Sequence, residues 1–369
     1  MSGARLHVAV LGAGTVGREV VAALRDRADE LRPADGAALE LVAVGVRDQA
    51  RAIRAGIPAE LLSDAPAHLV ADERIDVIVE LMGGDEPART LIAAALSMGK
   101  SVITANKHVI AHHGPELEAI AREKRAPFRF EAAVMGGTPI LRLLAEDLAG
   151  TVVTSLRGIV NGTTNHILTE MAMRGVGYDD ALTDAQVAGY AEADPSGDVE
   201  GGDAADKLVV LVRLAFGVWL DRAGIHVQRA GGRPGITGVT ADDLARAGRE
   251  GLAIRLLASA RRRAEDGGIE AAVLPTAVPI GSALGQTNGV RNRIEIEVEG
   301  LGLLAVEGPG AGGTATAAAV FADLLAIRRG DGSTWGDLPA AAIEAAASVL
   351  PKARGYFLGP SGVRYPVDD

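Results

Sequence analysis

The 369-residue sequence contains no cysteine, few aromatic residues and no long apolar run. The absence of cysteine excludes disulfides, thiolate catalysis and Cys-based zinc or iron–sulfur sites. With only 3% aromatic residues, the chain is poor in the side chains that stack on single-stranded nucleic acid. The longest apolar segment with a helical pattern, 208–220, contains Arg213 and is shorter than the roughly 20 residues that cross a bilayer.

The charge and the N-terminal sequence exclude further classes of protein. A net charge of −11 disfavours a nucleic-acid partner, because phosphate backbones select basic surfaces. No small-residue cleavage site follows the first apolar run, so we expect no signal peptide and a soluble, cytoplasmic protein without a membrane partner. A hydrophobic content of 48% is enough for a large core, and the length suggests about two domains.

Short aliphatic runs alternate with amphipathic ones over the first 135 residues. Near-continuous hydrophobic strands separated by helices predict an α/β domain with a parallel sheet covered on both faces. The expected strands are 6–12, 39–46, 75–81, 101–105 and 128–134. The expected helices are 18–32, 87–99 and 115–125.

The pattern changes after residue 136, and strands come to dominate after Thr240. This order predicts an α+β domain with a mostly antiparallel sheet. The expected strands are 151–160, 252–262, 269–278, 293–300 and 301–308. The expected helices are 137–148, 165–175, about 183–191, about 203–220, one within 308–327 and one at 339–349.

A glycine-rich motif follows the first expected strand. The segment VAVLGAGTVG places Gly12, Gly14 and Gly17 in the G-x-G-x-x-G spacing between a strand and a helix. Gly12 permits a tight turn, Gly14 lets a pyrophosphate approach the backbone, and Gly17 allows close packing of helix and strand. The helix then meets the phosphates with the N–H groups of its first residues, Thr15 and Val16. The motif predicts a Rossmann-type, doubly wound dinucleotide-binding domain.

The end of the second strand, GVRDQARAIR, bears on the choice between NAD and NADP. Asp48 could bind a ribose 2′-hydroxyl, whereas Arg47 or Arg51 could hold a 2′-phosphate. Because Arg47 lies immediately after the strand, where a planar cation can cover the adenine, we expect NADP rather than NAD.

Lys107 follows the fourth strand within TANKHVIAHHG. Strand ends at the carboxyl edge of an open α/β sheet face the ligand crevice, which would place Lys107 near the nicotinamide. A lysine after a strand is more often a solvated surface group, but Thr104 and Asn106 are small polar neighbours able to orient this one. The seven histidines show no metal-ligand spacing and are given no metal role.

The stretch AEADPSGDVEGGDAADK, at 191–207, carries six acidic residues and ends on one cation, Lys207. A calcium loop counted from Asp194 fails, because its sixth residue is Val199 rather than glycine. Asp203 and Lys207 are four residues apart at the start of an expected helix and therefore share one face. They form either a surface ion pair or a lysine that a carboxylate holds for a substrate carbonyl.

Six blocks of the sequence resemble the homoserine dehydrogenase family, over about residues 5–328. In order, they are VAVLGAGTVG, TANK, EAAVMGGTPI, GIVNGTTNHIL, AGYAEADPSGDVEGGDAADK and GPGAGGTATAAAV. The resemblance implies NAD(P)-dependent interconversion of L-homoserine and L-aspartate 4-semialdehyde in threonine, methionine and isoleucine biosynthesis. It implies a dinucleotide-binding domain over 1–136 with 306–369. It also implies a catalytic domain over 137–305 that pairs in a homodimer.

The resemblance assigns roles to four charged residues. Lys207 corresponds to the family's acid–base lysine, and we give Lys107 a shared catalytic role beside substrate and nicotinamide. Glu192 and Asp203 correspond to the acidic groups that hold the substrate's amino end. The chemistry agrees, because reduction of an aldehyde puts negative charge on its oxygen, which an ammonium group can stabilise and protonate.

Further cofactor contacts and a cation follow from the same resemblance. Thr104 and Gly310 would contact the dinucleotide, together with the glycine-rich turn, Arg47 and Lys107. The family also binds a monovalent cation, usually sodium. The expected ligands are the Glu131 side chain and the backbone carbonyls of Val134, Gly136 and Thr138.

The sequence departs from the family pattern at several positions. His166 stands where tyrosine is usual, Thr138 where an aliphatic residue is usual, and the GTATA turn lacks a proline. About 40 residues follow the last long helix, too few for a regulatory ACT domain, so we expect no threonine inhibition through one.

Two alternative functions were weighed against this one. A related dehydrogenase of another amino acid or semialdehyde would require a different acidic block. A catalytically inactive NAD(P)-sensing protein would be expected to lack Lys107 or Lys207, and both are present.

Overall fold

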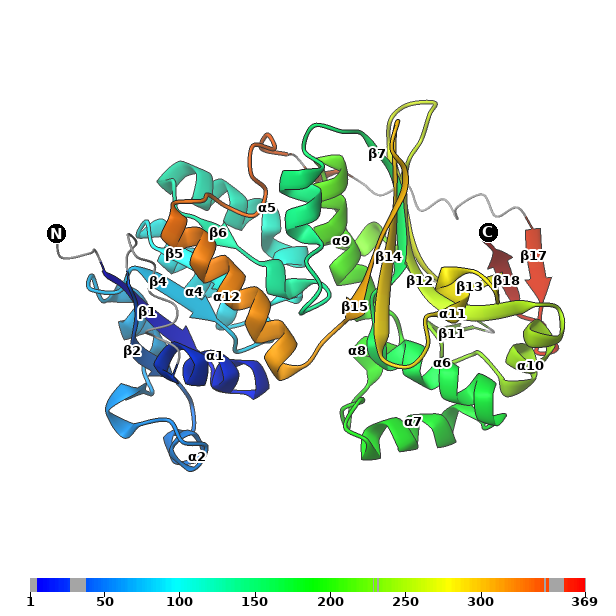
Figure 1. Ribbon diagram of the computed structural model, residues 1–369, viewed down its shortest axis with the longest axis horizontal. Helices are drawn as coiled ribbons and strands as arrows, with labels where there is room; N and C mark the ends of the chain where they lie inside the picture. The colour runs from blue at the N-terminus through cyan, green and yellow to red at the C-terminus, as the bar shows by residue number, and fades with distance from the viewer. Residues whose placement is uncertain are drawn as a thin grey trace. The chain divides into compact units, whose positions relative to one another are not determined.

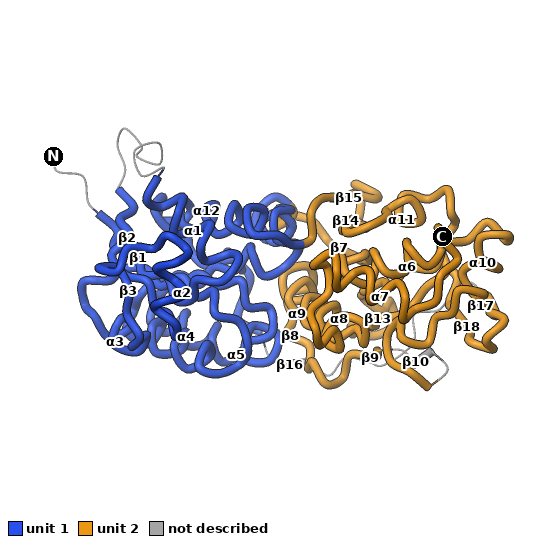
Figure 2. The backbone as a smooth tube through the Cα atoms, turned by 90° about the horizontal axis from the view of Figure 1, so that it is seen from below, with its two compact units in different colours: residues 1–147, 311–342 blue, residues 148–310, 343–369 orange. Residues whose placement is uncertain are grey.

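The computed structural model describes residues 5–26, 38–227, 229–230, 232–341, 343–344 and 355–368. The chain forms two compact units, drawn in different colours in Figure 2. Unit 1 comprises residues 1–147 and 311–342, and unit 2 comprises residues 148–310 and 343–369.

Unit 1 is built on a six-stranded parallel sheet in the order β3-β2-β1-β4-β5-β6. The strands are β1 (Arg5–Leu11), β2 (Ala38–Gly45), β3 (Leu62–Ser63), β4 (Val77–Glu80), β5 (Ser101–Thr104) and β6 (Phe128–Arg129). This order is that of a doubly wound sheet, in which ligands bind outside the carboxyl ends of the strands where the order reverses. The reversal lies between β1 and β4, whose register pairs Leu11 with Glu80.

Helices cover both faces of this sheet (Figure 1). They are α1 (Thr15–Asp26), α2 (Gln49–Arg54), α3 (Pro66–Ala71), α4 (Ala88–Ser97), α5 (Lys107–Lys124) and α12 (Gly313–Arg329). Helix α12 comes much later in the sequence than the other helices of unit 1, and it packs beside α1. Helix α4 packs beside α5. All four residues of β4 are buried. This burial agrees with the sheet covered on both faces that the continuous hydrophobic runs predicted.

Unit 2 is built on a mostly antiparallel sheet in the order β15-β14-β7-β12-β13-β18-β17, with β9 also paired to β13. The strands are β7 (Val153–Ile159), β9 (His226–Val227), β12 (Leu252–Arg262), β13 (Ile269–Pro279), β14 (Arg291–Val298), β15 (Gly302–Pro309), β17 (Gly355–Leu358) and β18 (Arg364–Val367). Short pairs join β10 (Arg229–Ala230) to β11 (Arg233–Pro234), and β8 (Trp219–Leu220) to β16 (Ile343–Glu344). The α/β-plus-α+β fold class predicted from the sequence is therefore confirmed.

The helices of unit 2 include one that is buried along almost its whole length. They are α6 (Gly162–Arg174), α7 (Tyr178–Val187), α8 (Ser196–Val199), α9 (Gly202–Phe216), α10 (Ala241–Arg249) and α11 (Ala283–Gln286). Helix α9 packs on β12 and β13, and α6 packs on α7 and β12. Helix α9 carries both Asp203 and Lys207.

Several elements differ from their expected bounds. Helix α5 begins at Lys107, because the side chain of Asn106 caps it and Pro115 lies inside it rather than at its start. Helix α9 ends at Phe216, because Gly217 takes a left-handed conformation with φ 78°. The strand expected at 128–134 stops at Arg129, and a 3₁₀ turn follows it.

The last segment of the chain differs most from the expected domain division. Strand β18 pairs with β13 through Ala277 and Val367, so residues 343–369 belong to unit 2 rather than to the dinucleotide-binding unit. Of the helix expected at 339–349, most lies outside the described residues, and Ile343–Glu344 is a strand. The second half of the helix expected at 18–32 also lies outside them.

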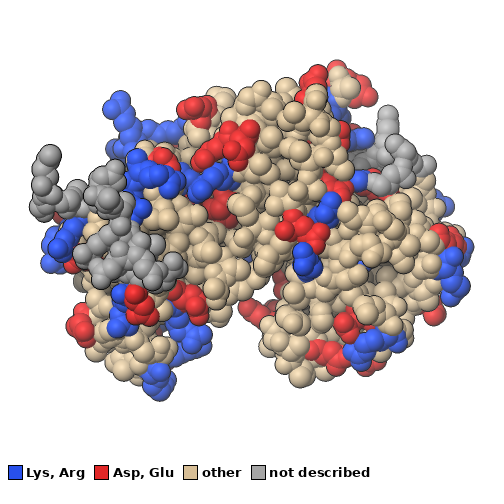
Figure 3. Space-filling model, in the orientation of Figure 1, with Lys and Arg blue, Asp and Glu red and all other residues tan. Residues whose placement is uncertain are grey.

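The surface carries charges of both signs. In Figure 3, Lys and Arg side chains are interspersed with Asp and Glu on both units, and neither sign forms a continuous field on that face. Among the residues described, no helix has the length and apolar character that a membrane crossing requires.

Candidate active site

The glycine-rich turn after β1 has the geometry of a dinucleotide cradle. Gly12 has φ 102°, and a Cβ built on it would lie 2.6 Å from the carbonyl oxygen of Leu81. A Cβ on Gly17 would lie 2.0 Å from the carbonyl oxygen of Gly12, so α1 can pack this closely only with glycine there. No atom lies within 4 Å of a Cβ placed on Gly14, which leaves room above the backbone for a phosphate.

Residues after β2 offer an exposed cation. Arg47 is exposed, and no residue that the structure describes pairs with its guanidinium. The Asp48 side chain accepts a hydrogen bond from the backbone N–H of Arg51 at 2.8 Å and so caps α2. Asp48 therefore has a local structural role, which sequence reasoning had not assigned to it.

Lys107 is the first residue of α5, at the carboxyl edge of the sheet. The Asn106 side chain caps this helix by accepting from the N–H of Val109 at 3.2 Å. Thr104 is fully buried, and its hydroxyl donates to the Glu80 carboxylate at 2.6 Å and accepts from the N–H of Asn106 at 2.9 Å. The Thr104 hydroxyl is thus engaged within unit 1.

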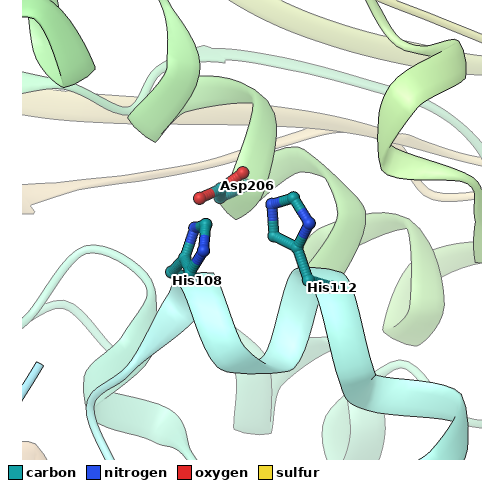
Figure 4. Close-up of side chains that lie close together, drawn as sticks. All are labelled: His108, His112 and Asp206. Atoms are coloured by element: carbon teal, nitrogen blue, oxygen red, sulfur yellow. The ribbon is translucent and has the colours of Figure 1, made fainter. Parts of the chain in front are cut away.

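Two histidines lie one helical turn apart on α5, and the sequence analysis did not predict their contact. The imidazoles of His108 and His112 have ring centroids 4.2 Å apart (Figure 4). Asp206, also labelled in that figure, belongs to α9 of unit 2, where it accepts a hydrogen bond from Arg222. The i, i+4 spacing of these histidines was the available signal.

Lys207 is almost completely buried in unit 2. Its ammonium group donates to the Asp203 carboxylate at 2.7 Å and to the carbonyl oxygen of Val160 at 2.7 Å. Lys207 is 8% exposed, so the pair is not the solvated surface ion pair of the simpler hypothesis. A buried ammonium held by one carboxylate and one carbonyl has a fixed direction, which a proton-transferring group needs.

Asn161 is a residue of this site that the sequence reading missed. Its side-chain nitrogen donates to Asp203 at 2.8 Å and to Asp198 at 2.7 Å, while its oxygen accepts from the N–H of Thr164 and caps α6. It therefore joins the starts of α6 and α9 to α8. The signal was an asparagine before a helix in NGTTN, a typical N-cap.

The remaining substrate candidate, Glu192, is exposed. Its backbone carbonyl accepts from Gln186 at 3.0 Å. Nearby in sequence, Tyr190 lies against His166 with ring centroids 4.7 Å apart, so the unusual histidine of the GTTNHIL block contacts the residue just before the acidic stretch. No hydrogen bond among the described residues joins the Glu192 carboxylate to Asp203 or Lys207.

Glu131, the expected side-chain ligand of a cation, is a buried carboxylate in unit 1. Glu131 accepts from the N–H groups of Leu141 at 3.1 Å and Arg142 at 2.8 Å. Burial, followed by repulsion from the Asp323 carboxylate, raises the pKa of Glu131 to about 7. Gly136 has φ 45°. The N–H of Thr138 donates to the carbonyl oxygen of Met135, so residues 135–138 form a tight turn shortly after Glu131. A cation would supply the counter-charge that burial demands.

Gly310 ends the first of the two segments of unit 2, just before the turn into α12. A Cβ on Gly310 would lie 2.3 Å from the side-chain nitrogen of Asn292. Asn292 is fully buried, and neither atom of its amide has a hydrogen-bond partner among the described residues. The close packing explains why glycine is needed at this position.

Comparisons with known proteins agree with this geometry. The family model described as "Homoserine dehydrogenase" matches residues 139–325, and the model of the homoserine dehydrogenase NAD-binding domain matches residues 12–131. The chain is 43% identical over 325 residues to homoserine dehydrogenase of Mycobacterium tuberculosis, covering 87% of this chain and 72% of the relative. It is 42% identical over 327 residues to that of Synechocystis, covering 87% and 73%.

Solved structures show the same likeness. A homoserine dehydrogenase from Thiobacillus denitrificans superposes with a TM-score of 0.85 at 38% identity, covering 94% of this chain and 81% of that one. A hyperthermophilic archaeal homoserine dehydrogenase in complex with NADPH superposes with a TM-score of 0.71 at 29% identity, covering 87% and 97%. The chain belongs to the homoserine dehydrogenase family, whose members are NAD(P)-dependent oxidoreductases acting on a CH–OH group.

Proposed function

We propose that Lys207 transfers the proton in the interconversion of L-homoserine and L-aspartate 4-semialdehyde, with Lys107 as a second catalytic lysine. The observation that carries this proposal is the buried Lys207 ammonium, held at 2.7 Å by both Asp203 and the Val160 carbonyl. A bound nicotinamide supplies the hydride chemistry. Lys207 would donate a proton to the aldehyde oxygen during reduction and accept one from the alcohol during oxidation.

Asp203 and Glu192 are proposed to hold the substrate's ammonium group. Support comes from the chemistry, since carboxylates are the natural partners of an ammonium. Asp203 has a second task, because the same carboxylate oxygen accepts from both Lys207 and Asn161. Its loss should therefore weaken substrate binding and also disorder the catalytic lysine.

The test is homoserine-dependent reduction of NAD and of NADP by the wild type and by Lys207→Ala. We expect the variant to lose roughly 10²–10⁴-fold in kcat, the usual contribution of a positioned acid or base. The matched control is Lys100→Met, a buried lysine of unit 1 whose ammonium donates, among the described residues, to the carbonyls of Asp72 and Ile75. Equal rates in the wild type and Lys207→Ala would refute the catalytic role.

We also propose that the enzyme prefers NADP, with Arg47 holding the 2′-phosphate. Arg47 is exposed at the end of β2, and Asp48 is engaged in capping α2. Arg47→Ala should weaken NADP binding about tenfold or more and leave NAD binding unchanged. Fluorescence titration of both reduced forms checks this, and unaltered NADPH affinity would exclude Arg47.

A monovalent cation, sodium, is proposed to bind at Glu131 with the carbonyls of Val134, Gly136 and Thr138. The buried, poorly compensated Glu131 carboxylate supports a site for positive charge. Sodium chloride should raise the melting temperature more than tetramethylammonium chloride at equal ionic strength. Glu131→Gln should abolish that difference, and a difference that persists in the variant would place the cation elsewhere.

Finally, we propose a homodimer that pairs through the sheet of unit 2. Support comes from exposed apolar side chains at one edge of that sheet: Leu303 on the edge strand β15 is 55% exposed, and Leu301 just before it is 59% exposed. Light scattering should give twice the 37.8 kDa mass of one chain. A monomer at micromolar concentration would contradict the proposal.

A further inference from the structure

Glu80 is a fully buried carboxylate at the carboxyl end of β4, and none of the roles described so far uses it. One carboxylate oxygen accepts from the backbone N–H of Met82 at 2.7 Å and from that of Gly83 at 3.2 Å. The other accepts from the Thr104 hydroxyl at 2.6 Å. Glu80 therefore joins the loop after β4 to the end of β5, the neighbouring strand.

The bond to Thr104 continues to the start of α5. Thr104 accepts from the N–H of Asn106, whose side chain caps α5 and donates to the Gly84 carbonyl at 2.7 Å. Lys107 is the next residue. The loop 81–84 and the turn 104–107 are thus tied twice, once through Glu80 and once through Asn106.

The same loop reaches the glycine-rich turn by a different route. The N–H of Leu81 donates to the Leu11 carbonyl at 2.7 Å, in continuation of the sheet, and the Leu81 carbonyl lies against Gly12. The Met82 nitrogen that Glu80 binds also lies beside Gly12, but the bond from Leu81 to Leu11 does not involve Glu80 and continues to hold the loop to the glycine-rich turn. Loss of the Glu80 carboxylate should therefore disturb Met82, Gly83 and the turn at Thr104 while leaving the glycine-rich turn in place.

The groups that contact the Glu80 oxygens are hydrogen-bond donors. Burial raises the pKa of Glu80, against the opposing effect of hydrogen bonds from Thr104, Met82, Gly83 and the Asn106 side chain. Among the residues described, no cation pairs with it. Burying a carboxylate is costly, and the hydrogen bonds that both of its oxygens accept offset part of that cost.

We propose that Glu80 is a positioning residue for the nicotinamide half of the dinucleotide and for Lys107. In a doubly wound sheet of this order, β4 and β5 belong to the half that binds the nicotinamide nucleotide, and β1 and β2 to the adenylate half. The inference rests on the proposed placement of the dinucleotide and Lys107 at this edge. It goes beyond that placement by naming the residue that fixes the two nicotinamide-side loops.

The experiment measures two nicotinamide dinucleotides and their two adenylate fragments against three variants of the full-length protein. The ligands are NADPH, which engages both halves, and adenosine 2′,5′-bisphosphate, which engages only the adenylate half; NADH and AMP are measured in parallel. The variants are Glu80→Gln, Thr104→Val and the control Glu118→Gln. Glu118 is a buried carboxylate further along α5 that binds Arg122 at 2.7 Å. Binding is measured by titration, and kcat and the homoserine KM by turnover.

Glu80→Gln should weaken NADPH roughly tenfold or more, as for the loss of a hydrogen bond to a charged group, and should lower kcat. The bisphosphate should bind within about twofold of wild type, because its half of the sheet keeps its contacts. Thr104→Val should likewise weaken the binding of NADPH but not that of the bisphosphate. It provides the test if Glu80→Gln does not fold. Glu118→Gln should bind both ligands as the wild type does.

Two results would overturn the inference. Wild-type NADPH affinity in Glu80→Gln, or equal weakening of NADPH and the bisphosphate, would leave Glu80 as a structural carboxylate only. If the wild type itself bound none of the four ligands, the proposed dinucleotide site would be wrong, which is a distinguishable failure.

Discussion

Replacement of Tyr365 by phenylalanine should destabilise unit 2 by a measurable amount, because Tyr365 serves a buried carboxylate. Asp243 is fully buried near the start of α10, and Tyr365 donates to it at 2.7 Å from β18. Asp243 also accepts from the N–H and the hydroxyl of Ser361 and from the N–H of Thr240. These bonds attach the terminal hairpin β17–β18 to α10.

The expected cost follows from the kind of bond removed. A hydrogen bond to a charged group contributes about 1.5–3 kcal/mol, and Tyr365→Phe removes one while leaving the other donors to Asp243 in place. For a unit of this size, each kcal/mol lowers the melting temperature by about 2–4 °C. Asp243→Ala, which leaves several buried donors without an acceptor, should cost more, about 1–3 kcal/mol for each donor that stays unpaired.

The assay is urea unfolding followed by circular dichroism, with Tyr356→Phe as the matched control. Tyr356 lies on the same hairpin but is 55% exposed, so its variant should match the wild type. A double-mutant cycle of Tyr365→Phe with Asp243→Asn should show coupling of at least about 1 kcal/mol. Equal stability of Tyr365→Phe and Tyr356→Phe would refute the reasoning.

The loss of stability caused by Tyr365→Phe should also depend on pH. Burial tends to raise the pKa of Asp243, but the hydrogen bonds from Ser361, Tyr365 and Thr240 outweigh it and hold the pKa below its usual value. A carboxyl whose pKa is lower in the folded state contributes its stability above its unfolded pKa and loses it as the pH falls through its folded pKa. The destabilisation by Tyr365→Phe should therefore be constant from pH 7 to about 5 and shrink below about pH 4.

Three further predictions concern close packing and buried charge. Gly310→Ala should lower stability by about 1–3 kcal/mol because its Cβ would meet the Asn292 side chain, and Asn292→Ala should relieve the loss in a thermal melt. Gly17→Ala should abolish NADPH binding, since its Cβ would lie 2.0 Å from the Gly12 carbonyl; an unchanged titration would contradict the cradle geometry. Lys100→Met should lower the urea midpoint by leaving two carbonyls unpaired at the opposite end of the sheet, with kcat preserved.

Local pattern was enough to predict most elements of the fold. The strands 252–262 and 269–278 were expected within one residue of β12 and β13, because alternation and length are encoded in the strand itself. The start of α5 was not predicted: the helix was expected from residue 115, and Asn106, which caps it, was considered only as a polar neighbour of Lys107. The bulk of α9 was predicted, but its end at Gly217 was not.

The candidate site divides in a similar way. Lys207 and Asp203 could be paired from their spacing of four residues, because neighbours on a helix face are fixed by its pitch. The Val160 carbonyl that completes the lysine's contacts lies 47 residues away in sequence, and no local pattern signals it. Asn161 was visible only as a possible cap, and its bonds to Asp198 and Asp203 depend on how α6, α8 and α9 pack.

The sequence by itself determined the two classes of sheet, the glycine-rich dinucleotide turn and the family, since these reside in periodicity and in short contiguous blocks. Tertiary structure alone decided that Glu80 meets Thr104, 24 residues away, and that Asp243 meets Tyr365, 122 residues away. It also decided that residues 343–369 join unit 2. These contacts depend on strand order and register, which bring distant residues together through the cooperative burial of whole elements rather than through any local pattern.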